Sequence, residues 1–185
     1  MRILIAEDDP VVALALVERV RELGHEVDGP HADGGAALVA ALTDPPDLYL
    51  LDIGLPRLDG LALARTLSER GLRRPLVIVT GQAETSLVDD AADAGVDAYL
   101  VKPVDSRALH AALIVSAARH GELRAAETLL EERKVVERAK DLLAEMLGIP
   151  ASEAYRRLQR SARDRNLRLV EVARTLIDQQ AMLRP

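Results

Sequence analysis

Short, almost wholly apolar runs recur along the first 105 residues of this 185-residue chain, and stretches with helical periodicity separate them. Strands that are apolar on both faces, with helices between them, indicate a parallel sheet covered by helices on both sides. We therefore expect an α/β fold, doubly wound around a five-stranded parallel sheet. The expected strands are Arg2–Ala6, His25–Gly29, Asp47–Asp52, Pro75–Thr80 and Ala98–Val101. The second of them has the weakest signal.

The stretches between these strands are typical of helices. In the first of them, Val12, Leu16 and Val20 are spaced so that they share one helical face, and Pro10 suits a first helical turn. Glycines follow several of these stretches and are expected to end them. The expected helices are Pro10–Leu23, Asp33–Leu42, Leu58–Arg70, Glu84–Ala94 and Asp105–His120.

The composition excludes several classes of protein. The chain has no cysteine, which excludes disulfides, zinc–thiolate sites and thiol catalysis. It has three tyrosines and no phenylalanine or tryptophan, so readout of single-stranded nucleic acid on stacking rings is not expected. No run of about 18 apolar residues occurs, and the apolar start is too short for a signal peptide. We expect no membrane association and a cytoplasmic location.

Polar residues follow four of the expected strands. Glu7 and Asp8 come after the first strand, Asp52 ends the third, Thr80 ends the fourth and Lys102 follows the fifth. Ligands of doubly wound sheets bind beyond the carboxyl ends of the strands, where these side chains should meet. Carboxylate oxygens suit Mg²⁺, and a cation, a carboxylate nucleophile, a hydroxyl and a lysine together make a phosphoryl-transfer site. A single acid at a strand end is usually a helix cap, but four such groups favour a site.

Residues 1 to about 118 resemble a response-regulator receiver domain, which has a flavodoxin-like fold. The matching pieces are ILIAEDDP, LLDIGLPRLDG, VIVTG and YLVKP, in the order and at the spacing of that family. The resemblance implies that the domain is not an enzyme. It would accept a phosphoryl group from a sensor histidine kinase or a phosphotransfer protein, with slow self-dephosphorylation possible.

The same resemblance implies roles for the acidic residues. Asp52 would be the phosphoacceptor, and Glu7, Asp8 and Asp52 would hold Mg²⁺ together with the backbone carbonyl of Gly54. Asp9 is an alternative member of the acidic pair. Gly54 departs from the family, which commonly has a larger residue such as methionine there, so the departure is expected to open the pocket and change the rate of phosphate loss.

The remaining implied roles fall near the last two strands. Thr80 and Lys102 would contact the phosphoryl group, and Tyr99 would be the aromatic residue that switches conformation. Lys102 and Pro103 match a family dipeptide that often has a cis bond. Val104 stands where phenylalanine is common, which weakens the expected apolar anchor.

The last third of the chain lacks strand signals. A long amphipathic helix is expected from about residue 121, followed by a break at Gly148, a short helix from Ser152 to Asp164 and a last helix from Leu169. Its imperfect heptad seam consists of Ala125, Leu129, Val136, Ala139, Leu143 and Met146. The seam predicts a partly coiled-coil homodimer, and packing of the helix on its own chain is the alternative. We expect a receiver domain over 1–118, a helical linker or coiled coil over 119–130, and a small all-α three-helix domain over 131–185.

Charge divides the chain in the same way. The net charge of −6 would argue against nucleic acid, but it is an average. Residues 1–118 hold 10 basic and 19 acidic residues, for a net −9, whereas residues 119–185 hold 14 and 11, for a net +3. Arg156, Arg160 and Arg163 recur at helical spacing on one face, where guanidinium groups suit phosphates and guanine edges. A solvated face of a small helical bundle is the alternative.

From about residue 131 the tail resembles an ANTAR domain, a three-helix RNA-binding antitermination module. The matching pieces are VERAK-x-LL, the GI break, EAYRRLQR, ARDRN and L-x-x-VA, with departures at Asp141 and Ala144. The resemblance implies binding to paired RNA hairpins in a nascent transcript, which would favour an antiterminator over a terminator. We also expect a homodimer on activation. The candidate RNA-binding residues are Lys140, Arg156, Arg160, Arg163, Arg165 and Arg168.

Three alternatives remain open from the sequence. The last two helices can be a helix-turn-helix of a DNA-binding response regulator. The tail can serve only dimerisation or another protein interaction. A phosphatase with an aspartyl nucleophile is less favoured, because such enzymes usually carry a second Asp two residues on, where this chain has Gly54.

Overall fold

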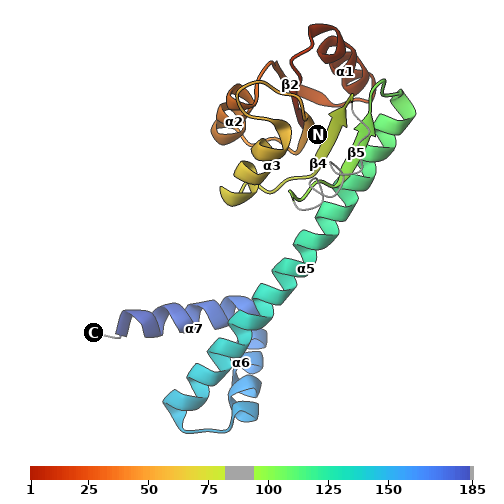
Figure 1. Ribbon diagram of the computed structural model, residues 1–185. Coiled ribbons are helices and arrows are strands. Elements are labelled where there is room, and N and C mark those ends of the chain that lie inside the picture. The colour runs from red at the N-terminus through yellow and green to blue at the C-terminus, as the bar shows by residue number, and fades with distance from the viewer. Residues whose placement is uncertain (82–93, 184–185) are drawn as a thin grey trace. The chain divides into compact units, whose positions relative to one another are not determined.

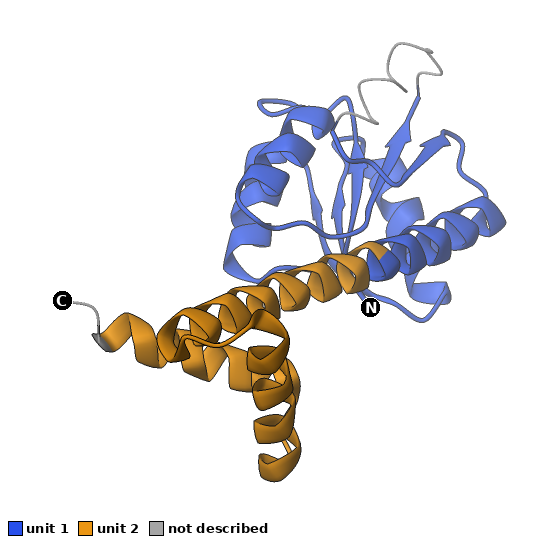
Figure 2. Ribbon diagram, turned by 90° about the horizontal axis from the view of Figure 1, so that it is seen from below, with its two compact units in different colours: residues 1–122 blue, residues 123–185 orange. Residues whose placement is uncertain are grey.

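The computed structural model describes residues 1–81 and 94–183 (Figure 1). It has two compact units, Met1–Glu122 and Leu123–Pro185, called here the N-terminal unit and the C-terminal unit (Figure 2). No helix in the described residues is both long and apolar enough to cross a membrane.

The N-terminal unit is built on a parallel sheet. In the described residues it has five strands in the order β2-β1-β3-β4-β5, and every neighbouring pair is parallel. The bounds are β1 Arg2–Ala6, β2 Glu26–His31, β3 Leu48–Asp52, β4 Leu76–Thr80 and β5 Ala98–Val101. The expected fold is therefore confirmed. The weak signal of the second strand also has a reason, because β2 lies at the sheet edge and is half exposed.

Two apolar cores cover the two faces of this sheet, which explains why the central strands are continuously apolar. One core joins alternate strand residues such as Leu4 and Leu51 to α2 and α3, and the other joins Ile3 and Leu50 to α1 and α5. Figure 1 shows these helix pairs on opposite sides of the sheet. The bounds are α1 Pro10–Glu22, α2 Gly34–Thr43, α3 Gly60–Glu69 and α5 Ser106–Leu147. The helix expected at Glu84–Ala94 lies almost entirely outside the described residues.

Helix α5 differs from the sequence expectation, which placed one helix at Asp105–His120 and another after it. The structure has a single helix of 42 residues, and Gly121 lies in its interior. A glycine inside a helix costs about 1 kcal/mol relative to alanine. The alanines and charged residues around it are good helix formers, so this cost does not end the helix.

The C-terminal unit packs α6 and α7 against the end of α5. The bounds are α6 Ala151–Arg165 and α7 Leu169–Leu183. Helix α6 starts one residue before the expected Ser152, because the carbonyl oxygen of Pro150 accepts the first-turn N–H bonds and no side chain caps the helix. Asn166, in a left-handed conformation with φ of 54°, ends it.

The core of this unit accounts for half of the expected heptad seam. Ala139 is fully buried against Leu158 and Ala173, and Val136 and Leu143 pack on the same cluster. The other three seam residues, Ala125, Leu129 and Met146, are exposed. The middle of the seam therefore packs on its own chain, which was the alternative to a dimer contact.

Candidate functional site

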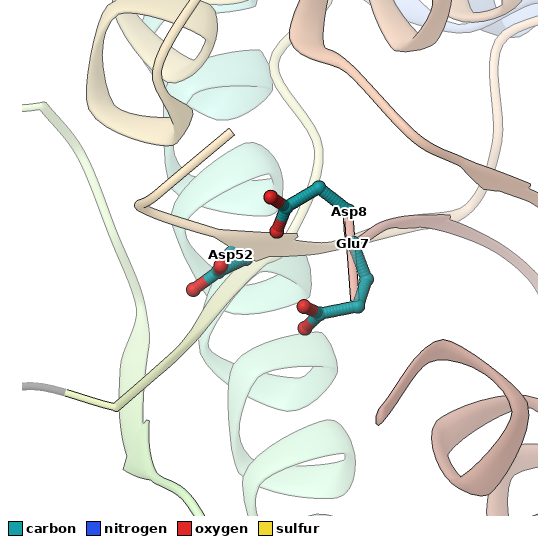
Figure 3. Close-up of side chains that lie close together, drawn as sticks. All are labelled: Glu7, Asp8 and Asp52. Carbon is teal, nitrogen blue, oxygen red and sulfur yellow. The ribbon is translucent and has the colours of Figure 1, made fainter. Parts of the chain in front are cut away.

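Three carboxylates meet at the carboxyl edge of the sheet. Glu7 and Asp8 follow β1, and Asp52 is the last residue of the neighbouring strand β3, so strand pairing brings them together. One oxygen from each lies within 4.8 Å of the others (Figure 3). Glu7 and Asp52 are buried and Asp8 is exposed. The site therefore has a buried acidic floor and one acidic group at its mouth.

Lys102 supplies the positive charge among these acids. Its Nζ atom lies 2.7 and 2.9 Å from the two carboxylate oxygens of Glu7 and 3.3 Å from Asp52 Oδ2. The backbone N–H of Lys102 donates to the carbonyl oxygen of Thr80. This bond extends the pairing of β4 with β5 and fixes the position of the Lys102 backbone. The Lys102–Pro103 bond is cis, as the family dipeptide implied.

Burial and charge act in opposite directions on the pair. Burial raises the pKa of Glu7, and the nearby charge of Asp52 adds to this, against the effect of Lys102. Burial alone would lower the pKa of Lys102, but the hydrogen bond to Glu7 and the charges of both acids outweigh it and raise that pKa. Lys102 is therefore charged at neutral pH and holds the acidic cluster together.

The donor set fits a hard divalent cation. Glu7 Oε2 is buried, and although it lies close to Lys102 Nζ it has no hydrogen bond of suitable direction among the described residues. A buried carboxylate oxygen with spare acceptor capacity, next to two further carboxylates, is what Mg²⁺ uses in proteins. Glu7, Asp8 and Asp52 are thus the residues that could hold such an ion.

Two glycines lie against Asp52. A Cβ atom at Gly54 would be 3.3 Å from Asp52 Oδ2, so the missing side chain leaves that flank of the carboxylate uncovered. A Cβ atom at Gly60 would be 2.1 Å from the Asp52 carbonyl oxygen, which no relaxation of a side chain can relieve. The sequence analysis predicted no role for Gly60. The feature that could have indicated one is its position directly after Asp59, the N-cap residue of α3, in the LDG piece.

The other expected switch and contact residues lie at the same edge of the sheet or next to it. Thr80 is buried at the end of β4, and Tyr99 is half-buried in β5 against the core shared with α2 and α3. Val104 is buried in the opposite core, so the smaller residue still serves as an apolar anchor.

An ion pair between Asp33 and Arg57 was missed by the sequence analysis. Asp33 caps α2, and the backbone N–H of Ala36 together with the Arg57 guanidinium holds the pKa of Asp33 below its usual value. Arg57 has a φ of 66°, a left-handed conformation that costs free energy for a residue with a side chain. The pair tethers the loop that carries Gly54, and no periodic pattern in the sequence could have revealed it.

The candidate RNA-binding residues separate into two groups. Within the described residues, the exposed side chains of Arg160, Arg163 and Arg165 on α6 form no ion pair. The other three contact acids. Arg156 is 3.9 Å from Glu153 and Arg168 is 3.2 Å from Glu132.

Lys140, the third paired cation, lies on α5. It pairs with Glu137, and its Nζ is 3.6 Å from Asp141, the departure from the family. The hydrogen bond to Glu137 and both acidic charges raise its pKa. Its charge is therefore largely neutralised within the chain.

Comparisons with known proteins agree with this architecture. The model of the response regulator receiver domain matches residues 3–114, and that of the ANTAR domain matches residues 124–177. The chain therefore belongs to the response regulators and combines a receiver domain with an ANTAR domain.

Two relatives match this chain over different lengths. The chain is 38% identical to the transcriptional regulatory protein PdtaR of Mycobacterium tuberculosis, over 96% of this chain and 89% of that protein. It is also 38% identical to the response regulator protein PmrA of Pseudomonas aeruginosa, over 67% of this chain and 60% of that protein.

Solved structures resemble the N-terminal unit. The receiver domain of a modulated diguanylate cyclase from Desulfovibrio desulfuricans is 29% identical with a TM-score of 0.60, covering 65% of this chain and 95% of that one. A CheY-like receiver protein from Methanospirillum hungatei is 28% identical with a TM-score of 0.61, covering 65% and 96%. Both support the receiver fold.

Proposed function

We propose that this protein is a phosphorylation-controlled response regulator that binds RNA stem-loops in nascent transcripts and promotes transcription antitermination. The observation that carries the proposal is a buried Asp52, set among Glu7, Asp8 and Lys102, in the same chain as an ANTAR domain whose helix α6 exposes three unpaired arginines. The protein is a regulator and not an enzyme, and it works in the cytoplasm.

Asp52 accepts the phosphoryl group from a sensor histidine kinase or a phosphotransfer protein. A carboxylate oxygen of Asp52 forms the new bond to phosphorus while the bond from phosphorus to the donor nitrogen breaks and the imidazole leaves. Glu7, Asp8, Asp52 and the backbone carbonyl of Gly54 hold Mg²⁺. When bound, the ion neutralises charge on the phosphoryl oxygens.

Lys102 is placed to do part of the same work without moving far. Its Nζ is already 3.3 Å from Asp52 Oδ2, so the ammonium can pair with a phosphoryl oxygen on that carboxylate. Glu7 orients the ammonium through two short contacts. Thr80 supplies a hydroxyl contact, and Thr80 and Tyr99 then reorient and change the surface of the receiver.

The change on the receiver favours a homodimer that carries two ANTAR domains. Phosphorylation adds roughly one to two negative charges at Asp52, which biases a two-state equilibrium. Two linked ANTAR domains bind a pair of hairpins more tightly than either alone, because the second contact is intramolecular. The acidic receiver, with a net charge of −9 over residues 1–118, disfavours RNA near it until this rearrangement. We place the domain boundaries at 1–118, 119–130 and 131–185, so that the middle part of α5 is the linker.

On the RNA side, Arg160, Arg163 and Arg165 make the principal phosphate contacts because no acid competes for them within the described residues. Lys140, Arg156 and Arg168 contribute less, since RNA must displace Glu137, Glu153 and Glu132 from them.

The first test is labelling of the full-length protein with a small phosphodonor and Mg²⁺. Wild type should incorporate phosphate and Asp52→Asn should not, and equal labelling of the two would defeat the assignment of Asp52.

The second test is competition between hairpin RNA and duplex DNA at fixed salt. Preference for the duplex would support a DNA-binding regulator, and no binding to either would support a tail that serves only protein interaction.

A further inference from the structure

A cavity of about 620 Å³ lies entirely within the C-terminal unit. This is the size range, roughly 300–1,000 Å³, of pockets that hold small organic groups. Helix α5, the first turns of α6 and the start of α7 form its walls. We call it the Tyr155 cavity, because Tyr155 is the aromatic residue among those that line it.

The charges in this cavity are nearly balanced. Arg133, Lys140 and Arg168 line it, and so do Glu132 and Glu137. Glu137 pairs with Lys140, and Glu132 Oε1 is 3.2 Å from Arg168 Nη1. The net charge of the five side chains is +1. The exposed arginines of α6 without ion pairs do not line the cavity, so the strongest phosphate contacts lie outside it.

The remaining lining suits a flat aromatic group. Tyr155 is half-buried, and Val136, Leu169 and Val170 supply apolar surface. In the described part of the chain, Glu132 Oε2 and Glu137 Oε1 accept no hydrogen bond, so each carboxylate has an oxygen available for an N–H donor. A planar group with amino hydrogens matches a cavity that combines an aromatic ring with carboxylate acceptors and few free cations.

We propose that the Tyr155 cavity binds one unpaired, amino-bearing nucleobase from the loop of a bound RNA hairpin. The inference rests on the proposed RNA-binding function and adds sequence readout to it. The arginines of α6 hold the backbone, Tyr155 stacks on the base, and Glu132 and Glu137 accept its N–H groups. Tyr155, Glu132 and Glu137 thus determine which RNA sequence is bound, a role that contacts to the RNA backbone alone would not give them.

The experiment uses the full-length protein and stem-loop RNAs with one fixed stem and a randomised loop. The tightest hairpin is selected and then remade with a single abasic site at each loop position in turn. For wild type, one loop position should weaken binding by roughly 5- to 150-fold when its base is removed, the range of one stacked base. Uracil at that position should also weaken binding, because it lacks an amino group.

Variants then locate this base. Tyr155→Ala should weaken binding to the intact hairpin by a similar factor and should bind the critical abasic hairpin no worse than wild type does. Tyr155→Phe should retain wild-type affinity, because it keeps the aromatic ring that stacks. The unchanged binding of the critical abasic hairpin by Tyr155→Ala shows that its loss on the intact hairpin is not a failure to fold. Met182→Ala, at a residue 86% exposed and outside the cavity lining, is the matched control and should change nothing.

The two levels of the proposal fail differently. If wild type binds no hairpin in either phosphorylation state, RNA binding itself is wrong and the cavity inference falls with it. If wild type binds hairpins but Tyr155→Ala binds the intact loop equally well, the cavity inference alone is overturned. Equal effects of Tyr155→Ala on intact and abasic hairpins would also overturn it.

Discussion

The pair formed by Glu7 and Lys102 allows a quantitative prediction. The Glu7 side chain is fully buried and that of Lys102 is 19% exposed, with N–O distances of 2.7 and 2.9 Å. At this separation and an effective dielectric constant of about 20, the attraction is roughly 6 kcal/mol. The loss of hydration on burial offsets part of it. Removing the lysine while leaving the buried carboxylate should therefore cost about 3–5 kcal/mol of the stability of the N-terminal unit at neutral pH.

The pH dependence of this loss follows from Glu7. In Lys102→Met no ammonium opposes the burial of Glu7, so its pKa in the folded state lies well above that of the unfolded chain. A carboxyl of this kind contributes its stability below the unfolded pKa and loses it as the pH rises through the folded pKa. The deficit of Lys102→Met relative to wild type should therefore shrink as the pH falls toward about 4.5. Adding Glu7→Gln should restore more than about 2 kcal/mol at neutral pH, because it removes the unpaired charge.

Native-state hydrogen exchange with a metal chelator present is the suitable assay. Peptides from β1, β3 and β4 report the N-terminal unit, and peptides from α6 and α7 serve as an internal control. Two units make a single unfolding free energy ill-defined, so the local measurement is needed. A Lys102→Met variant within about 0.5 kcal/mol of wild type, or one whose deficit does not change with pH, would refute the reasoning.

Four further substitutions test packing and the phosphorylation site. Gly60→Ala should cost the N-terminal unit about 1–3 kcal/mol, because its Cβ would lie 2.1 Å from the Asp52 carbonyl oxygen. Gly121→Ala, at an uncrowded position inside α5, should instead stabilise this helix by up to about 1 kcal/mol. Opening free energies from hydrogen exchange that change in the same direction for both variants would contradict this. Leu158→Ala, at a residue 3% exposed, should cost the C-terminal unit about 2–5 kcal/mol and leave exchange in the N-terminal unit unchanged. Gly54→Met should lengthen the lifetime of the phosphoryl label on Asp52 severalfold, because the methionine side chain would cover the open flank of the carboxylate. An unchanged lifetime would contradict this and would indicate that water reaches the phosphoryl group from another side.

Much of the N-terminal unit was predictable because its signals are local and redundant. The central strands are buried on both faces, so each appears as an uninterrupted apolar run. The acidic cluster also follows from the sequence, because parallel strands end at one edge and bring Glu7 and Asp52 together. The edge strand β2 was the weakest prediction because it has no such two-sided burial.

Some of the remaining features depend on contacts between residues far apart in the sequence. Nothing in the sequence indicates that Arg57 pairs with Asp33, which lies 24 residues away. The pair of Lys140 with Glu137 was also not predicted, although the two residues have the i, i+3 spacing that brings charges together on one helix. The continuity of α5 across Gly121 depends on a balance of small helix propensities. The scarcity of aromatic residues argued against base stacking, yet the one tyrosine in the C-terminal unit lines its cavity, which is the basis of the inference about Tyr155.

The central claim is that phosphorylation of Asp52 controls RNA binding by the ANTAR domain. The most direct measurement is a titration of the full-length protein against the selected hairpin, before and after treatment with phosphodonor and Mg²⁺, at several salt concentrations. Treatment should tighten binding by wild type and leave Asp52→Asn unchanged. Log affinity should fall with log salt with a slope of roughly −3 to −5, as expected for contacts from three to six cations. Equal affinity of wild type before and after treatment, or an equal response from Asp52→Asn, would contradict the claim.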